Sequence, residues 1–119
     1  MGAQKSFALI LGIVLLLVGI LGFFDNPIVG NNGYFGTNTY QDILHLIAGA
    51  CGVYAGTKGK GSGYNMIIGW IGIALGVLGF IPGIKELFLS LLNINIQITV
   101  LHLVLGIITL LVAYGVRKE

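Results

Sequence analysis

Two histidines are the side chains of this sequence best suited to chemistry in apolar surroundings. His45 opens the run LHLIAG, and His102 opens the similar run LHLVLG 57 residues later. An imidazole can donate or accept a hydrogen bond, relay a proton or bind a metal. An ionisable side chain inside a long apolar segment usually faces the interior of the protein, where it meets a partner. The pair therefore marks the candidate site of this chain.

Three interpretations of the two histidines follow from this chemistry. In the first, neutral imidazoles hydrogen-bond each other, Thr99, Asn38 or a backbone carbonyl and tie helices together. In the second, they are axial ligands of haem or another tetrapyrrole. The third is a proton relay or small transporter, but Asp42, one turn before the first histidine, has a threonine as its counterpart in the second run. Zinc is not expected, because Cys51 lies two turns deeper than His45 and no fourth ligand is available.

Composition indicates that these histidines lie in a membrane protein. Hydrophobic residues make up 56% of the chain, charged residues 8%, and the mean hydropathy is +0.99. Soluble domains carry about 25% charged residues. Four spans of about 20 residues each would nearly fill 119 residues. The net charge of +2 rests on few groups, and no basic patch interleaved with aromatic residues points to nucleic acid.

Four apolar segments predict four membrane-spanning helices. They cover residues 7–24, about 39–56, 64–81 and about 97–114. A short interfacial helix is predicted at 84–92, because its apolar side chains recur at helical spacing opposite Lys85 and Glu86. The segments 28–37 and 57–63 are rich in glycine and polar residues and are typical of loops.

Polar residues next to the apolar segments predict the helix caps. Thr39 followed by Asp42 resembles a capping box at the start of the second helix. Asn93 or Asn95 is expected to cap the last one. Cys51, alone in an apolar segment, is interpreted as a small packing residue.

The distribution of basic residues predicts the orientation of the helices. Lys5, Lys58, Lys60, Arg117 and Lys118 fall on one side of the predicted spans, and Lys85 falls on the other. By the positive-inside rule, both termini and the 57–63 segment are cytoplasmic in the cell membrane. Aromatic rings are expected at both interfaces, with Tyr54, Tyr64 and Tyr114 inside and Tyr40 outside.

A shift of 57 residues superposes the first half of the chain on the second. It aligns Gly12 with Gly69, Gly19 with Gly76, Gly22 with Gly79, Phe23 with Phe80, Asn38 with Asn95, His45 with His102 and Gly49 with Gly106. We therefore predict one domain, 1–119, made of two tandem parallel helical hairpins, with repeat 1 at about 7–60 and repeat 2 at about 64–117. A pseudo-two-fold axis along the membrane normal would place both histidines at equal depth, about two turns below the outer surface.

The glycines of the spans are expected to let helices approach closely. The predicted packing residues are Gly12, Gly19, Gly22, Gly49, Gly52, Gly56, Gly69, Gly72, Gly76, Gly79 and Gly106. In the tetrapyrrole interpretation, the four of these in the outer half (Gly19, Gly22, Gly76 and Gly79) would leave a slot for the macrocycle.

The chain also resembles a family of small prokaryotic four-span membrane proteins classed as a domain of unknown function. The resemblance rests on Asn26-Pro27-Ile28-Val29-Gly30, on Phe35-Gly36-Thr37-Asn38, on the Gly-Phe pairs Gly22-Phe23 and Gly79-Phe80, and on the His-x-x-x-Gly steps that begin at His45 and His102. It covers most of the chain, although the second copy has Gly83-Ile84 in place of Asn-Pro. It implies a fold and no activity.

Taken together, these features predict a non-enzymatic integral membrane protein that acts through packing. It would form a homo-oligomer or serve as a structural or accessory subunit of a larger membrane complex. No nucleophile with a base, pair of carboxylates or metal cluster can be assembled from the sequence. A haem or other tetrapyrrole held by His45 and His102 is the alternative function, and a small transporter or proton relay is the second alternative.

Overall fold

Helices make up nearly all of the computed structural model, which describes residues 2–116. The elements are α1 (Ala3–Gly22), β1 (Val29–Gly30), β2 (Phe35–Gly36), α2 (Thr39–Thr57), α3 (Gly61–Leu78), α4 (Ile84–Leu92) and α5 (Ile96–Gly115). The predicted all-α class is therefore confirmed. Arg117 and Lys118, which support the predicted orientation, lie outside the described residues.

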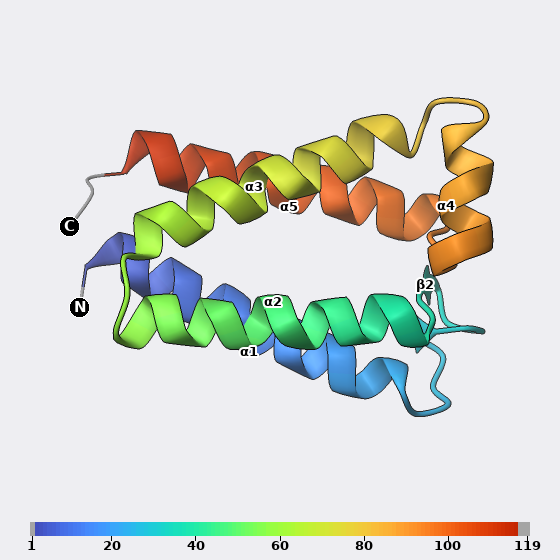
Figure 1. Ribbon diagram of the computed structural model, residues 1–119, viewed down its shortest axis with the longest axis horizontal. Coiled ribbons are helices and arrows are strands. Elements are labelled where there is room, and N and C mark those ends of the chain that lie inside the picture. The colour runs from blue at the N-terminus through green and yellow to red at the C-terminus, as the bar shows by residue number, and fades with distance from the viewer. Residues whose placement is uncertain (1, 117–119) are drawn as a thin grey trace.

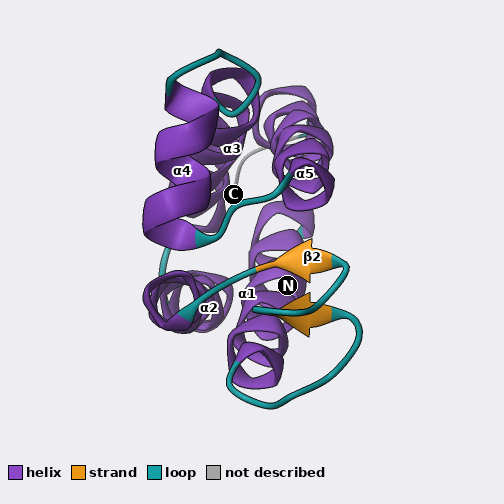
Figure 2. Cartoon of the chain, turned by 90° about the vertical axis from the view of Figure 1, so that its right-hand side faces the viewer, coloured by secondary structure: helices purple, strands orange, loops and turns teal. Residues whose placement is uncertain are grey.

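The four long helices form two hairpins. Helix α1 packs along α2, and α3 packs along α5. Figure 1 shows the two hairpins as two layers, with the start of α1 and the end of α5 at the same end of the molecule. The short helix α4 and the strands lie across the opposite end, which faces the viewer in Figure 2. The molecule measures 40 Å along its longest axis.

Asparagine side chains begin the second helix of each hairpin. The Asn38 side chain accepts a hydrogen bond from the Gln41 backbone N–H, and the Asn95 side chain accepts one from the Ile98 N–H. Such bonds satisfy backbone donors that the first helical turn leaves without a partner. The predicted cap at Thr39 is wrong by one residue, because Asn38 is the side chain that reaches the free N–H.

Helix α3 differs from its predicted range at both ends. It begins at Gly61 instead of Tyr64 and ends at Leu78, so only residues 58–60 connect it to α2. A Cβ atom on Gly61 would lie 2.6 Å from the backbone of Gln4 in α1. This close contact with α1 draws the glycine-rich segment into the first turn of the helix, although its composition is typical of a loop.

The segment predicted as the first outer loop contains two very short strands. Strands β1 and β2 pair in parallel, with Val29 opposite Phe35 and Gly30 opposite Gly36. The Asn26 side chain holds the entry to β1, because its Oδ1 accepts hydrogen bonds from two backbone N–H groups and its Nδ2 donates to carbonyls on both sides. Gly30 has a φ of +138°, a backbone conformation that favours glycine. The connection is thus an ordered cap over the bundle.

The apolar core is small and the apolar surface is large. The buried apolar side chains of residues 2–116 are Ala8, Leu11, Val29, Ala55, Ile94, Ile98 and Ala113. Large apolar side chains are exposed along all four long helices. Helices α1, α3 and α5 are long and apolar enough to cross a membrane, whereas α2 has the length but a lower hydropathy. Long apolar helices with exposed apolar side chains are typical of membrane proteins.

Candidate functional site

The two histidines lie opposite each other across the gap between the hairpins. His45 is in α2 and His102 is in α5, and their ring centroids are 6.3 Å apart with the ring planes tilted by 59°. Both Nδ1 atoms are buried and have no hydrogen-bond partner among the described residues. The backbones of α2 and α5 do not pack closely, so the two rings approach each other through their side chains.

The partners predicted for the histidines are engaged elsewhere. The Thr99 hydroxyl donates to the Asn95 carbonyl, and the Asn38 amide donates to the Leu91 carbonyl. A direct hydrogen bond between the rings would place their centroids about 5 Å apart, since the two nitrogens would be about 3 Å from each other. The observed 6.3 Å is longer than that.

Hydrogen bonds between the two halves of the chain hold the N-terminal ends of α2 and α5 in place. Asn38 Nδ2 donates to the carbonyl of Leu91, and Asn95 Nδ2 donates to the carbonyl of Tyr34. The two donors are 57 residues apart, and so are the two acceptors. Each half therefore caps its own helix with an asparagine and binds the connecting segment of the other half with the same side chain.

Glycine contacts between the two helices of each hairpin also follow this spacing. A Cβ on Gly49 would lie 2.7 Å from the Gly12 oxygen and the Leu16 nitrogen. A Cβ on Gly106 would lie 3.0 Å from the Gly69 oxygen and 2.6 Å from the Ile73 nitrogen. The other predicted packing glycines also lie against a neighbouring helix: Gly12, Gly19, Gly22, Gly52, Gly56, Gly69, Gly72, Gly76 and Gly79.

The four outer glycines do not leave a slot for a macrocycle. The side chain of Leu46 fills the space beside Gly19, and Leu103 fills the space beside Gly76. Asp42 lies directly against Gly22, and Thr99 lies against Gly79. All four positions are occupied from within their own hairpin. The glycine slot expected in the tetrapyrrole interpretation is therefore absent from this part of the described structure.

Two apolar grooves do open near the outer ends of α2 and α5. One has a volume of about 530 Å³ and the other about 510 Å³. The first is lined by Tyr34, Phe35, Ile96, Gln97, Val100, Leu101 and Val104, and the second by Tyr40, Ile43, Leu44, Leu91 and Leu92. Neither groove is lined by a histidine, so neither is placed to hold a cofactor that an imidazole binds.

Asp42 breaks the similarity between the two halves. Its side chain is 1% exposed, and its Oδ1 has no hydrogen-bond partner among the described residues. The corresponding residue of the second half is Thr99, whose hydroxyl is satisfied by a carbonyl of its own helix. A buried carboxylate is therefore present on one side of the histidine pair only.

A second buried polar cluster joins the hairpins at the opposite end of the molecule. The fully buried Gln4 donates from Nε2 to the carbonyls of Val112, Ala113 and Val116. Asn65 Nδ2 donates to the carbonyl and the side-chain oxygen of Gln4. Sequence reasoning missed this cluster, although the amides Gln4, just before the segment 7–24, and Asn65, just inside the segment 64–81, were a visible signal.

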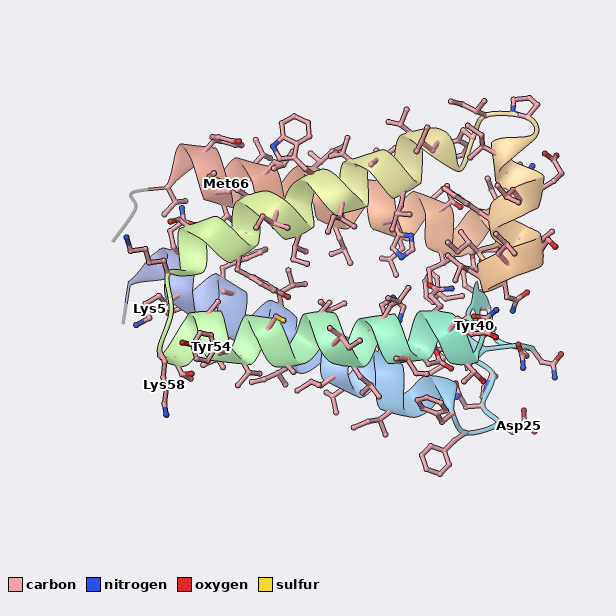
Figure 3. The ribbon with its side chains drawn as sticks, viewed as in Figure 1. Lys5, Asp25, Tyr40, Tyr54, Lys58 and Met66 are labelled. Carbon is pink, nitrogen blue, oxygen red and sulfur yellow. The ribbon has the colours of Figure 1, made fainter. Side chains whose placement is uncertain are left out.

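Two predicted positions differ from expectation at the surface. Cys51 is exposed on α2, so the prediction that it packs in the bundle is wrong. Tyr64 was expected at the inner interface, but its ring is half-buried and its hydroxyl donates to the Ala48 carbonyl of α2. Figure 3 shows Lys5, Tyr54 and Lys58 together at one end of the bundle and Asp25 and Tyr40 at the other.

The described side chains offer few donors for a metal or for catalysis. No group of three or more His, Cys, Asp or Glu side chains within residues 2–116 is placed to hold a metal ion. The histidine pair supplies two imidazoles and no more, which is too few for a closed zinc site. The pair can take part in hydrogen bonds between the hairpins, or it can bind a species that needs two ligands.

Comparison with known proteins identifies the family. No significant match is found among curated proteins, and none among solved structures. A domain of unknown function, DUF4383, matches residues 5–115, which include all five helices except the first residues of α1. The chain belongs to the DUF4383 family.

Proposed function

We propose that this protein is a four-span membrane protein of two repeated hairpins that acts as a structural, self-associating subunit without catalytic activity. Helix α2 would then cross the membrane together with α1, α3 and α5. The matched contacts of the two hairpins favour the repeat, and the positions of the lysines favour the orientation. The alternative, a tetrapyrrole carrier, is disfavoured by the filled glycine positions. A transporter is disfavoured because α1, α3 and α5 are continuous helices with few polar groups.

The burial of its polar residues supports a fourth span at α2. Gln41 and Asp42 lower the average hydropathy of this helix, but they are 3% and 1% exposed and would not face lipid. Its exposed middle section is apolar and includes Ile43, Leu44 and Ile47. Nineteen residues rise about 28 Å, close to the thickness of the hydrocarbon layer. The 40 Å long axis matches a bilayer with its headgroups.

The matched contacts support two hairpins related by a pseudo-two-fold axis. Donor and acceptor pairs, glycine contacts and the histidines all repeat with the same offset of 57 residues. Because each hairpin contains two spans, both would enter the membrane in the same direction. Lys5 and Lys58 lie at one end of the bundle and α4, with Lys85, at the other, which favours a cytoplasmic location for the lysine-rich end.

The observation that carries the proposed role is the ratio of exposed to buried apolar surface. The buried apolar side chains are few and mostly small, whereas the longest ones point outward from every long helix. Lipid covers such a surface, but it also offers ridges and grooves into which another helical protein can pack. The buried amides donate hydrogen bonds to backbone carbonyls and to one another, which is a structural use of polar groups.

Tryptophan substitution tests the proposed association. Ile10, Ile47, Ile67 and Leu111 lie on α1, α2, α3 and α5 and are 57% to 67% exposed. Lipid accommodates a larger side chain at such a position, whereas a protein interface does not. We expect the protein extracted with its lipid to have a native mass larger than the 12.6 kDa of a single chain. At least one of the four tryptophan variants should have a smaller native mass and an unchanged helix content.

Two results would contradict the proposed role. One is a monomeric mass at all protein concentrations in lipid nanodiscs. The other is a larger mass that none of the four variants changes, because association through the exposed helix faces would then be excluded. Ala8→Trp serves as the control for a folding defect, since Ala8 is fully buried and a larger side chain there disrupts the bundle itself.

A further inference from the structure

We propose that His45 and His102 form a two-coordinate binding site for a single copper(I) ion between the two hairpins. The inference concerns a ligand and does not depend on self-association, so either proposal can fail alone.

The spacing of the rings fits one metal ion between them. A metal–imidazole bond is about 2 Å long, and each nitrogen lies about 1 Å from its ring centroid, so two imidazoles on one ion have centroids about 6 Å apart. The observed separation is 6.3 Å. The tilt of 59° between the rings is compatible with this arrangement, because each ring can rotate about its own metal–nitrogen bond.

The state of the nitrogens also favours a ligand. Both Nδ1 atoms are buried and unpaired, and a buried polar atom without a partner costs free energy. In a neutral imidazole one nitrogen carries the proton and the other has a free lone pair. With the protons on Nε2, the two Nδ1 lone pairs would bind the ion and no buried nitrogen would remain unsatisfied.

The small number of donors selects the class of metal. Zinc in proteins takes four ligands, and calcium and magnesium take six or more oxygens. Within the described chain, no third His, Cys, Asp or Glu side chain joins the two histidines at a metal-binding distance. Copper(I) has a filled d shell and is stable with two nitrogen ligands in a line. It is also a metal to which imidazole binds well.

The remaining positive charge has a buried counter-charge nearby. Two neutral imidazoles leave the complex with one positive charge, which is unfavourable in an apolar interior. Asp42 lies three residues before His45, about 4.5 Å along the helix axis. Its carboxyl group lies against Gly22 of α1, and its Oδ1 is buried and unpaired. A carboxylate there would act on the ion through space, as an offsetting charge and not as a ligand.

Competition for copper(I) tests the site directly. The purified full-length protein in nanodiscs would be titrated without oxygen against bicinchoninate, which forms a coloured copper(I) complex. We expect one copper(I) per chain, with X-ray absorption reporting two nitrogen ligands at roughly 2 Å. His45→Ala and His102→Ala should each weaken binding by at least about 100-fold, because each removes one of the two bonds. Asp42→Asn should weaken it by about tenfold.

Matched variants separate loss of a ligand from loss of the fold. Cys51→Ala should bind copper(I) as the wild type does, because the thiol is exposed and outside the site. Gly69→Ala should also retain binding, because its closest contact is with the flexible Leu110 side chain, eight residues and about two turns from His102. Copper(I) should raise the melting temperature of both controls and of the wild type, but of neither histidine variant.

Several outcomes would overturn the copper(I) site. Binding that survives in the double variant His45→Ala/His102→Ala would place the ion elsewhere, and binding abolished by Cys51→Ala would assign it to the thiol. Binding lost equally in Gly69→Ala would show that the histidine variants act through packing. Zinc binding of comparable affinity would contradict two-coordination. A Soret band in the purified protein would identify a tetrapyrrole instead.

Discussion

Adding a single methyl group at Gly106 should strain the hairpin of α3 and α5. The new Cβ would lie 2.6 Å from the Ile73 nitrogen and 3.0 Å from the Gly69 oxygen, where carbon atoms ordinarily approach to about 3.5–4.0 Å. The helices would have to separate by about 1 Å, and a gap of that size removes a quarter to a half of each nearby dispersion contact. We expect Gly106→Ala to lower the free energy of unfolding by about 2 kcal/mol, within the range of overpacked cores.

The corresponding change in the other hairpin should have the same effect. Gly49→Ala meets the Gly12 oxygen and the Leu16 nitrogen, both at 2.7 Å. The assay is reversible unfolding of the purified protein in mixed micelles by increasing SDS, followed by far-ultraviolet circular dichroism and by the fluorescence of Trp70. Similar losses in the two variants would agree with the matched geometry of the hairpins.

Gly63→Ala is the matched control for these variants. A Cβ at Gly63 meets nothing within 4 Å, so this variant should be as stable as the wild type or more stable by up to about 1 kcal/mol, the usual gain from replacing a helical glycine. If Gly106→Ala is as stable as the wild type, or if Gly63→Ala loses as much, close packing at the glycines does not hold the hairpins together.

Three further predictions concern the polar contacts. Gln4→Leu should lower the free energy of unfolding by about 1–3 kcal/mol, because the carbonyls at the end of α5 lose their donor and Asn65 Nδ2 loses its side-chain acceptor. The exposed change Ser90→Ala should have no effect. Asn38→Ala and Asn95→Ala should each lower the free energy of thermal unfolding by about 1–2 kcal/mol, because each side chain caps a helix and binds the other half of the chain. The two losses should be similar, and a large difference between them would contradict the equivalence of the two asparagines. Hydrogen bonds donated by backbone N–H groups, above all that of Gly83, hold the pKa of Glu86 below its usual value. The stability that Glu86 adds to the start of α4 is therefore complete above about pH 4.3, and it is lost as the pH falls through the lower pKa of the folded state. The protection factor of the Gly83 amide against hydrogen exchange should therefore fall in acid in the wild type, and Glu86→Gln should remove this pH dependence.

Local patterns predicted the helices well, because length and apolar periodicity decide them. The helix over 84–92 has the predicted bounds, and each of the four long helices overlaps its predicted range. The ends of the helices were less predictable. Asn38 caps α2 in place of Thr39, and Gly61 joins α3, because hydrogen-bond geometry and contact with α1 decide these ends. Neighbouring residues alone contain neither kind of information.

The candidate site was only partly predictable for the same reason. The offset of 57 residues predicted that His45 and His102 are equivalent, and the structure brings their rings together. The spacing of the outer glycines did not reveal which neighbour they face, and Leu46 and Leu103 fill the expected slot. Likewise, apolar surroundings in the sequence did not reveal that Cys51 faces outward, because in a membrane protein both faces of a helix are apolar.

Chemical labelling of single cysteines tests the central claim, which is that α2 crosses the membrane and both hairpins have the same orientation. In a Cys51→Ala background, Asn32→Cys, Lys60→Cys and Ser90→Cys place a thiol in three exposed connections or surface positions. In intact cells, a membrane-impermeant maleimide should label the cysteines at 32 and 90 and should label the one at 60 only after the membrane is opened. Labelling of positions 32 and 60 from the same side would show that α2 does not cross the membrane and would contradict the proposed four spans.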